Sequence, residues 1–262
     1  ATGEVGPISA LQVNDGFAAA APNRVPAAQP AEMAASVFTA LLKARGVAVD
    51  GAAASGRTPA GAPPVASLSS APLAQVVGEV LKQSDNDGAE LFTKELGRMA
   101  GSPTTAAGVA AIRADLTAAG LPVSQLSMVD GSGLDRSDRV SCQLLVDVLQ
   151  RSGPAGALGA GLPVAGQSGT LQGRLVGTPA ATRLRAKSGS LDAVSSLSGF
   201  VMPVATAAGQ DQAAALTFSM IFNGNPSQTA TEAVEDRIGV ILAGYPQAPP
   251  LAQMSPLPPG SG

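Results

Sequence analysis

The chain has 262 residues, of which 45% are hydrophobic and 13% charged, and its net charge is −3. A chain of this length can bury a sizeable core as one large domain or two smaller ones. The acidic balance argues against a nucleic-acid partner, which would require a basic surface to release counterions from phosphates. Histidine is absent, so a Ser-His-Asp triad, a Cys-His pair and a histidine-ligated zinc are excluded. We expect no cofactor.

The chain has a single cysteine, Cys142, which excludes an internal disulfide and a thiolate metal cluster. We expect it to be a buried structural thiol on an amphipathic helix. No apolar run reaches the ~18 residues that span a bilayer. The opening "ATGEVGPISA" lacks the basic and apolar regions of a signal peptide. We therefore expect the chain to begin after a removed signal or to be a fragment.

The first part of the chain predicts a strand, a helix and a loop. A weakly alternating stretch within residues 1–20 predicts a strand that leads into a turn at Asn14-Asp15-Gly16. A helix follows and stops at Gly46, and residues 47–51 predict a short strand. Residues 51–70, rich in Ala, Gly, Pro and Ser, predict a surface loop. The apolar face of the helix, which we expect to face the core, carries Met33, Val37, Phe38, Leu41 and Leu42.

The middle of the chain predicts helices that are separated by short breaks. We expect helices over residues 73–83, 89–101 and 107–120, the last of them capped by Thr104 or Thr105. The break between the first two begins with the tripeptide Ser84-Asp85-Asn86, which contains neither Gly nor Pro.

A strand over residues 124–134 is expected next, and it contains the sequence Asp130-Gly131-Ser132-Gly133, which is typical of a tight turn. The helix that carries Cys142 follows over residues 139–151, with Ser137 or Asp138 as its cap. Arg136 and Arg139 are expected to be surface or ion-pair residues near the start of this helix.

The last part of the chain changes from helical periodicity to alternation. After a glycine-rich connector, residues 182–202 predict a hairpin and residues 215–224 a further strand. Residues 229–245 predict a closing helix. Helices that precede a run of adjacent strands favour an α+β fold. We expect one domain over residues 1–245 and a disordered or extended Pro-rich tail over residues 246–262.

Two short motifs stand out against this background. Ser84-Asp85-Asn86 interrupts two apolar helices, and such a junction can point a hydroxyl and a carboxamide into a cleft, although Ser and Asn also commonly cap helices. Lys187-Ser188-Gly189-Ser190 is expected on a strand, where it is either a solvated edge or a site. As a site it offers an ammonium, two hydroxyls and a bare backbone, and an extended peptide can pair with such an edge.

In this order the two motifs resemble the second and third motifs of the penicillin-recognising serine enzymes, whose first motif is S-x-x-K. The stretches "SALQVNDGF", "SDNDGAELFTKELG", "MVDGSGLDRSDRVS", "LPVAGQSGTLQGR" and "RAKSGSLDAVSSLSGFV" narrow the resemblance. They resemble the class C low-molecular-mass penicillin-binding proteins, which are D-alanyl-D-alanine carboxypeptidases and endopeptidases. The resemblance covers about residues 5–245 and implies the transpeptidase-like α+β fold, with an antiparallel sheet packed against helices.

The resemblance implies a role for each motif residue. Ser84 would relay protons toward the leaving amine, and Asn86 would hydrogen-bond the acyl side chain of the substrate. Lys187 would raise the local positive potential and assist proton movement. Ser188, at a position where the family more often has Thr, would bind the terminal carboxylate of the substrate. The backbone N–H of Ser190 would donate to the oxyanion, and Gly189 would let the substrate approach the strand.

The first motif of the family is missing, because no serine of this chain has a lysine three positions later. The acylating serine and its lysine would therefore lie on an N-terminal portion of the same protein, since no acyl-enzyme can form without a nucleophile. The chain would then be either the C-terminal piece of an enzyme cut in an exposed inserted loop, with the N-terminal piece still bound, or an isolated fragment.

The implied activity is that of a penicillin-sensitive D-Ala-D-Ala carboxypeptidase or endopeptidase. It would act outside the cytoplasm on peptidoglycan stem peptides, with β-lactam antibiotics as substrate mimics. Alternatives are a non-catalytic cell-wall-binding or regulatory protein and a serine β-lactamase. The β-lactamase would need a glutamate that drives deacylation, and no E-x-x-x-N motif lies between the two site motifs.

Overall fold

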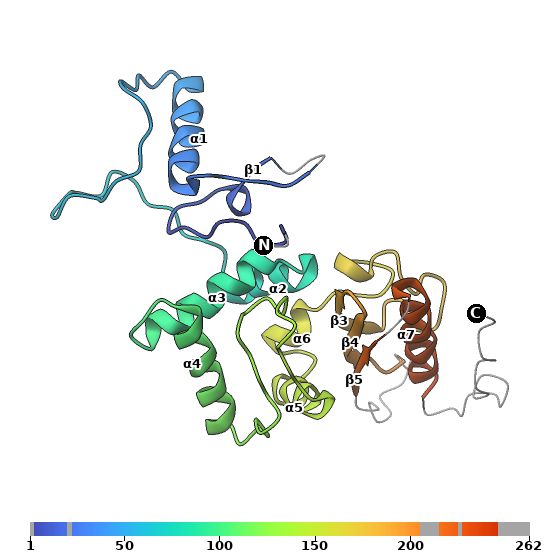
Figure 1. The fold of residues 1–262 in the computed structure, drawn as a ribbon. Coiled ribbons are helices and arrows are strands. Elements are labelled where there is room, and N and C mark those ends of the chain that lie inside the picture. The colour runs from blue at the N-terminus through green and yellow to red at the C-terminus, as the bar shows by residue number, and fades with distance from the viewer. Residues whose placement is uncertain (1–2, 20–22, 205–214, 225–226, 246–262) are drawn as a thin grey trace.

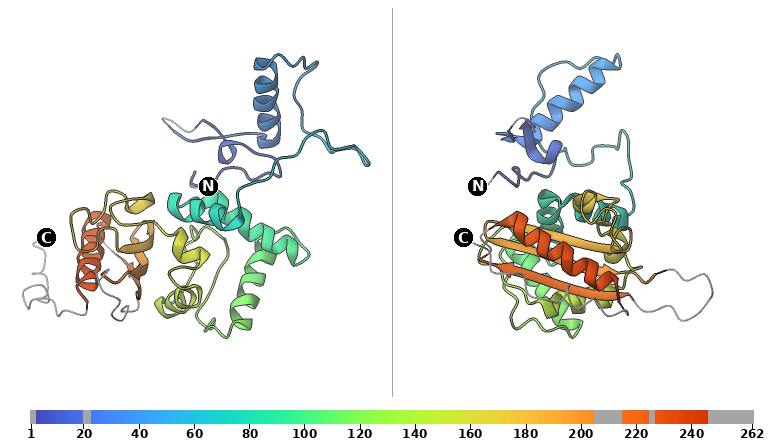
Figure 2. Two further views of the ribbon diagram at one scale, coloured as in Figure 1. Left: turned by 180° about the vertical axis from the view of Figure 1, so that it is seen from behind. Right: turned by 90° about the vertical axis from the view of Figure 1, so that its right-hand side faces the viewer.

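The computed structural model describes residues 3–19, 23–204, 215–224 and 227–245, and the tail predicted over residues 246–262 lies outside them. A sheet with its covering helix forms one side of the molecule, and a group of helices forms the other (Figure 1). The N-terminal segment extends beyond both (Figures 1 and 2). This mixture of helices and an antiparallel sheet confirms the predicted α+β fold class.

The sheet consists of β3 (Leu184–Leu191), β4 (Val194–Val201) and β5 (Leu216–Asn223), in the order β3-β4-β5. Both pairs are antiparallel, and Lys187 lies opposite Ser198. The helix α7 (Gln228–Ala243) packs on one face, while α5 (Cys142–Ser152) contacts β4 and β5 (Figure 2). The predicted hairpin, third strand and closing helix are therefore confirmed.

Apolar side chains lie on both faces of the sheet. Successive residues of a strand point to opposite faces, and helices cover both of these faces. Phe200 packs with Leu149 and Leu162 on the side of α5 and the short helix α6 (Ala157–Gly161). The larger cluster comprises Ala165, Leu171, Leu175, Ala180, Leu184, Ala186, Leu197, Val201, Phe218 and Ala243.

One buried carboxylate lies within this architecture. Glu235 of α7 is 1% exposed. Its Oε1 accepts from the Ser195 hydroxyl at 2.6 Å, and its Oε2 accepts from Arg174 Nη2 at 3.0 Å. Because both oxygens have partners, the buried charge is compensated and joins α7 to the sheet.

The helical side consists of α2 (Leu73–Gln83), α3 (Asn86–Met99) and α4 (Thr105–Ala118), with α6 against α2. The Thr104 hydroxyl accepts from Ala107 N and caps α4, as predicted. Gly78 and Gly161 let α2 and α6 approach closely, since a Cβ on Gly161 would lie 2.8 Å from the Gly78 Cα. None of the helices in the described residues is long and apolar enough to cross a membrane.

Two predicted strands are absent. Residues 47–51 form no strand, and within residues 124–134 only Ser127 makes a β-bridge, with Arg139. A strand requires a neighbour that completes a ladder, and in the described residues neither segment pairs beyond this single bridge. The cap of α5 is Ser141, which accepts from Leu144 N, rather than Ser137 or Asp138.

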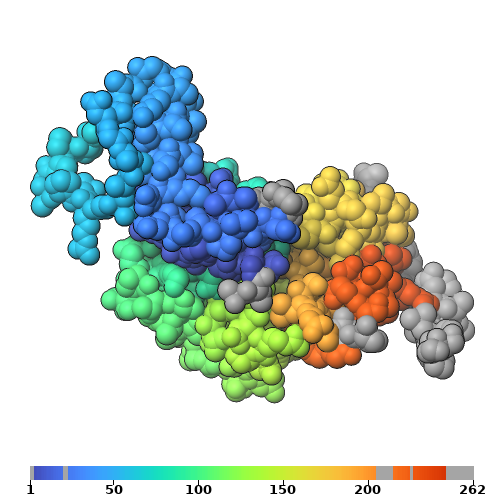
Figure 3. Space-filling view, turned by 45° about the horizontal axis from the view of Figure 1, so that its top comes forward, coloured from blue at the N-terminus to red at the C-terminus, as the bar shows by residue number. Residues whose placement is uncertain are grey.

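The predicted burial of two features was also wrong. Cys142, the first residue of α5, is free and partly exposed rather than buried. The helix α1 (Pro30–Ala44) forms as predicted, but its apolar face does not enter a core: Phe38 is 61% and Leu41 49% exposed. The helix stands away from the rest of the molecule (Figures 1 and 3), so no described segment covers this face.

The remaining elements of the N-terminal segment are small. The stretch predicted as a strand contains the 3-10 helix η1 (Asn14–Gly16), followed by β1 (Phe17–Ala19). β1 pairs antiparallel with β2 (Val25–Pro26). Residues 3–13 form no strand, so the strand predicted before the turn was wrong, and the first strand begins after the turn instead.

Candidate active site

The Ser-Asp-Asn motif forms the junction between α2 and α3. Ser84 has a left-handed backbone (φ 53°, ψ 47°), which few residues other than glycine adopt. Asp85 then caps α3, because its carboxylate accepts from Gly88 N at 2.9 Å. The left-handed residue and the cap explain how one helix ends and another begins without Gly or Pro.

The junction directs Ser84 toward the Lys-Ser-Gly strand. Lys187 Nζ donates to Ser84 Oγ at 2.7 Å and to the Ser188 carbonyl at 2.5 Å. These two acceptors, a hydroxyl and a carbonyl, carry no charge. Burial lowers the pKa of Lys187 to about 8. Lys187 can therefore give up a proton near neutral pH more readily than an exposed lysine, and Ser84 is its hydrogen-bonded partner.

The outer edge of β3 faces away from β4 and presents backbone donors. Ala186 N donates outward to the Pro163 carbonyl at 3.0 Å. Since amide directions alternate along a strand, the N–H groups of Ser188 and Ser190 point to this same edge. The edge position of β3 in the described sheet leaves this direction available for a substrate.

Gly189 has a packing reason in addition to its predicted role. A Cβ at this position would collide with the Ser196 hydroxyl on β4. A side chain here would therefore require the Ser196 hydroxyl to turn away, whatever it did to a substrate.

A second hydroxyl lies beside Ser188. Ser188 Oγ donates to Thr170 Oγ1 at 2.7 Å, and Thr170 lies in the 3-10 helix η2 (Gly169–Leu171). Gly169 is pressed against the end of α2, since a Cβ on it would lie 2.5 Å from the Lys82 carbonyl. Thr170 belongs to no motif that predicts a site residue, although it lies in "LPVAGQSGTLQGR", one of the stretches that carry the family resemblance.

Asn86 lies at the same junction, but its carboxamide has another partner. Asn86 Nδ2 donates to the Glu4 carbonyl at 3.4 Å, and the neighbouring Asp87 accepts from Gly6 N at 2.9 Å. The structure thus joins Ser84, Lys187 and Ser188 by hydrogen bonds. Asn86 follows Ser84 by two residues with its carboxamide on the Glu4 carbonyl, and Ser190 is exposed two residues beyond Ser188 on β3.

One group of carboxylates in the described residues has a spacing that could hold a metal. Ligand atoms of Asp15, Asp85 and Asp87 lie within 4.8 Å of one another. Two of the three already accept backbone hydrogen bonds, and burial raises the pKa of Asp87. These contacts account for the cluster as part of the α3 start, and we assign no metal to it.

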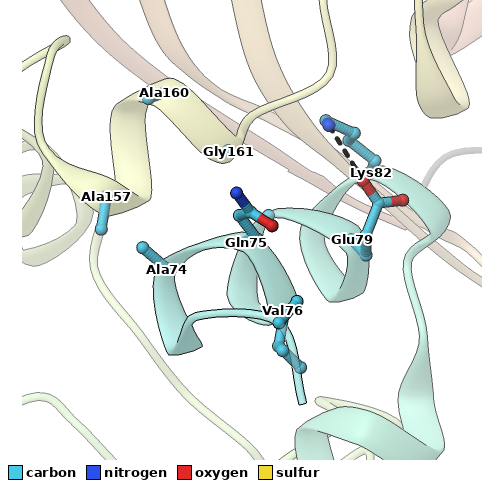
Figure 4. A pocket seen from close by; sticks show the side chains of 10 residues that line it. Ala74, Gln75, Val76, Glu79, Lys82, Ala157, Ala160 and Gly161 are labelled. Carbon is cyan, nitrogen blue, oxygen red and sulfur yellow. Dashed lines mark hydrogen bonds and ion pairs between the residues drawn. The ribbon is translucent and has the colours of Figure 1, made fainter. Parts of the chain in front are cut away.

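A groove of about 630 Å³ runs between α2 and α6 (Figure 4). Small residues such as Ala74, Ala157 and Ala160 line it, and the Glu79–Lys82 ion pair lies at its edge, with an N–O distance of 3.1 Å. Ser84 and Lys187 do not line this groove. The chemistry lies at the α2–α3 junction instead.

An antiparallel sheet covered by helices, with the Ser-Asp-Asn junction facing the Lys-Ser-Gly strand, defines a low-molecular-mass penicillin-binding protein. The model of the D-Ala-D-Ala carboxypeptidase 3 (S13) family matches residues 12–245. The chain therefore belongs to this family.

Relatives agree with this assignment. A D-alanyl-D-alanine carboxypeptidase from Actinomadura sp. (strain R39) is 36% identical over 240 residues, covering 86% of this chain and 43% of the relative. A penicillin-sensitive carboxypeptidase A from Dictyostelium discoideum is 31% identical over 234 residues, covering 84% of this chain and 44% of the relative. The chain thus spans less than half the length of these curated relatives.

A solved structure shares the fold. Penicillin binding protein 4 of Haemophilus influenzae, crystallised with a β-lactam, superposes with a TM-score of 0.64 at 24% sequence identity. The match covers 78% of this chain and 47% of that chain.

Proposed function

We propose that this chain supplies two walls of the active site of a serine D-Ala-D-Ala carboxypeptidase or endopeptidase, which acts outside the cytoplasm on peptidoglycan stem peptides. The observation that supports the proposal most directly is the 2.7 Å hydrogen bond from Lys187 Nζ to Ser84 Oγ. It joins the two motifs across 103 positions of sequence.

The reaction is acyl transfer to a serine that this sequence does not contain. The serine hydroxyl gives its proton to the lysine of S-x-x-K while the serine oxygen forms an ester with the carbonyl carbon of the penultimate D-Ala. The peptide C–N bond then breaks, and the terminal amine leaves. Ser84, bonded to Lys187, delivers a proton to that amine, and the N–H of Ser190 donates to the developing oxyanion. Water then hydrolyses the ester and regenerates the serine.

The terminal carboxylate of the substrate binds at the other end of the site. Ser188 supplies the hydroxyl, with the ammonium of Lys187 nearby, while Asn86 binds the acyl side chain once its amide leaves the Glu4 carbonyl. A β-lactam carries a carboxylate and a strained amide in a similar arrangement. We therefore propose that β-lactam antibiotics acylate the same site.

The N-terminal portion of the same protein, which carries S-x-x-K, is the proposed partner of this chain. The exposed apolar face of α1 supports this, since Val37, Phe38 and Leu41 are 39%, 61% and 49% exposed. Covering such side chains is worth ~25 cal/mol per Å² of apolar area. The alternative, a non-catalytic wall-binding protein, would keep the cleft and lack the nucleophile.

The test is an assay of D-Ala release from a peptide that ends in D-Ala-D-Ala, using this chain joined to or mixed with the S-x-x-K portion. We expect activity only when both parts are present, and a loss of about 100-fold or more in kcat with S84A. The matched control is Ser190→Ala, which keeps the backbone N–H and should retain most of the activity. Equal activity in S84A and the unmodified protein would overturn the proposal.

A further inference from the structure

One loop contacts both walls of the candidate site at the end beyond Ser190. Residues 130–139, which we call the strap, belong to the connection between α4 and α5 (Figure 1). The sequence predicted a tight turn and surface arginines here. The turn contacts α3 and one arginine contacts the end of β3, so the two lie on opposite walls.

The first anchor of the strap is on α3. Glu90, which is 7% exposed, lies one turn after Asn86. Its Oε1 accepts from the backbone N–H groups of Gly131 and Ser132, both at 2.9 Å, and from the Ser132 hydroxyl at 2.8 Å. Hydrogen bonds to an ionised carboxylate are about twice as strong as neutral ones, so this end of the strap is held firmly.

The strap and α3 are tightly packed at this anchor. A Cβ on Gly131 would collide with the Thr93 hydroxyl and lie 2.7 Å from the Ala89 carbonyl, both on α3. The turn is therefore pressed against the same helix that begins at the Ser-Asp-Asn junction.

The second anchor is on the sheet. Arg136 Nη1 donates to the Asp192 carbonyl at 2.8 Å. Asp192 follows Leu191, the last residue of β3, and is two positions after Ser190. The strap thus holds the end of the strand that carries the Lys-Ser-Gly motif.

Between its anchors the strap is stiffened by its own carboxylates. Asp130 accepts from Gly133 N at 2.7 Å and from Asp135 N at 2.8 Å. Asp138 accepts from Val129 N at 2.8 Å. A flexible loop would not fix the distance between the two anchors. A loop that is held by several internal hydrogen bonds does fix it.

We propose that the strap, through Glu90 on α3 and Arg136 on the β3–β4 turn, is a positioning element that sets the separation between Ser84 and Lys187. The loop of Thr170 spans the opposite end of the site, so the two walls are tied at both ends. This inference rests on the proposed function in one respect: it takes Ser84 and Lys187 as active-site residues on the two walls.

The experiment follows the titration of Lys187 by ¹³C NMR in this chain alone, with labelled lysine. The chain has four lysines, and Lys187→Met assigns the signal. We expect E90A and R136M each to admit water to the site and to raise the pKa of Lys187 by about one unit. The double variant should add little to either single one, because the strap acts as a unit.

Matched controls separate positioning from general loosening. Glu95→Ala lies on the same helix and removes only an exposed contact with Arg98, so the Lys187 titration should not change. Arg136→Lys keeps a donor and should restore most of the original titration. Arg136 is exposed, so R136M tests the proposal even if E90A does not fold.

An unchanged Lys187 titration in R136M and in folded E90A would overturn the proposal, even if both variants melted earlier. The measurement uses no substrate and no nucleophile. A failed assay of D-Ala release would therefore count against the proposed function but not against the role of the strap. An unchanged titration would count against the role of the strap but not against the proposed function.

Discussion

Lys187 Nζ lies 2.7 Å from Ser84 Oγ and makes no ion pair with a carboxylate among the described residues. A lysine in this setting is poised between its charged and neutral forms, since burial disfavours the ammonium and the two neutral acceptors only partly compensate. The same relationship has a consequence for stability and another for catalysis.

The first prediction concerns stability and pH. The pKa of Lys187 is lowered from 10.5 to about 8, so the unfolded state binds more protons between these values. The contribution of Lys187 to the free energy of unfolding is therefore fully present above pH 10.5, where the lysine is neutral in both states. It is lost as the pH falls through 8. We expect K187M to be more stable than the unmodified chain at pH 7, by about 1–2 kcal/mol, with the gain vanishing at pH 10.5. Urea unfolding at both pH values measures it, and an equal gain at both would contradict the assignment.

The second prediction concerns the hydroxyl pair of Ser188 and Thr170. In the presence of the S-x-x-K portion, S188A should raise KM for a peptide that ends in a free carboxylate by about 10-fold, since one hydrogen bond to a charged group is lost. Ser188→Thr keeps the hydroxyl and should behave like the unmodified protein. Thr170→Val should raise KM less than S188A does. The proposed role of Ser188 would fail if S188A and S188T had the same KM.

The third prediction concerns the buried carboxylate of α7. E235A removes one of the two carboxylates that pair with Arg174 and the acceptor of the Ser195 hydroxyl. Removing one side of a buried ion pair costs about 3–5 kcal/mol. Asp236 also accepts from Arg174, at 2.6 Å, so the lower end of this range is expected. Glu79→Ala, whose exposed ion pair with Lys82 is worth at most about 1 kcal/mol, serves as the control. Similar losses in the two variants, measured by urea unfolding, would contradict this account.

The fourth prediction concerns Asp138 of the strap and the way its charge changes the stability of the protein with pH. Burial, together with the nearby carboxylates of Asp130 and Asp135, raises the pKa of Asp138 to about 6. The folded state therefore binds the proton more tightly, and stability declines as the pH rises from about 4 to 6. Asp138→Asn should remove this decline and stabilise the protein at pH 7. The gain should be no more than about 1 kcal/mol, because solvent screens a partly exposed group. A pH series of thermal unfolding that is unchanged in D138N would exclude this role.

Sequence periodicity predicted the elements whose partners are close along the chain. The β3–β4 hairpin needs only its own alternation and a short turn, and the predicted helix cap Thr104 acts within one turn. The strands expected at residues 47–51 and 124–134 failed because a strand also requires a neighbour, which local sequence does not specify.

Only the part of the site that lies in recognisable motifs could be predicted, because contacts between distant residues leave no local signal. Ser84 and Lys187 belong to motifs that a family resemblance can identify, so their approach was expected. Thr170 and Glu90 act through contacts with distant residues, Ser188 and the strap. Their side chains give no signal of this in the linear sequence.

The most direct test of the central claim uses fluorescent penicillin, with this chain and the S-x-x-K portion as separate polypeptides resolved on a denaturing gel. We expect a label on the S-x-x-K polypeptide only. We also expect S84A or K187A in this chain to slow the labelling about 100-fold or more. A label on this chain, or a labelling rate indifferent to both substitutions, would contradict the claim that Ser84 and Lys187 form one active site with a serine from elsewhere.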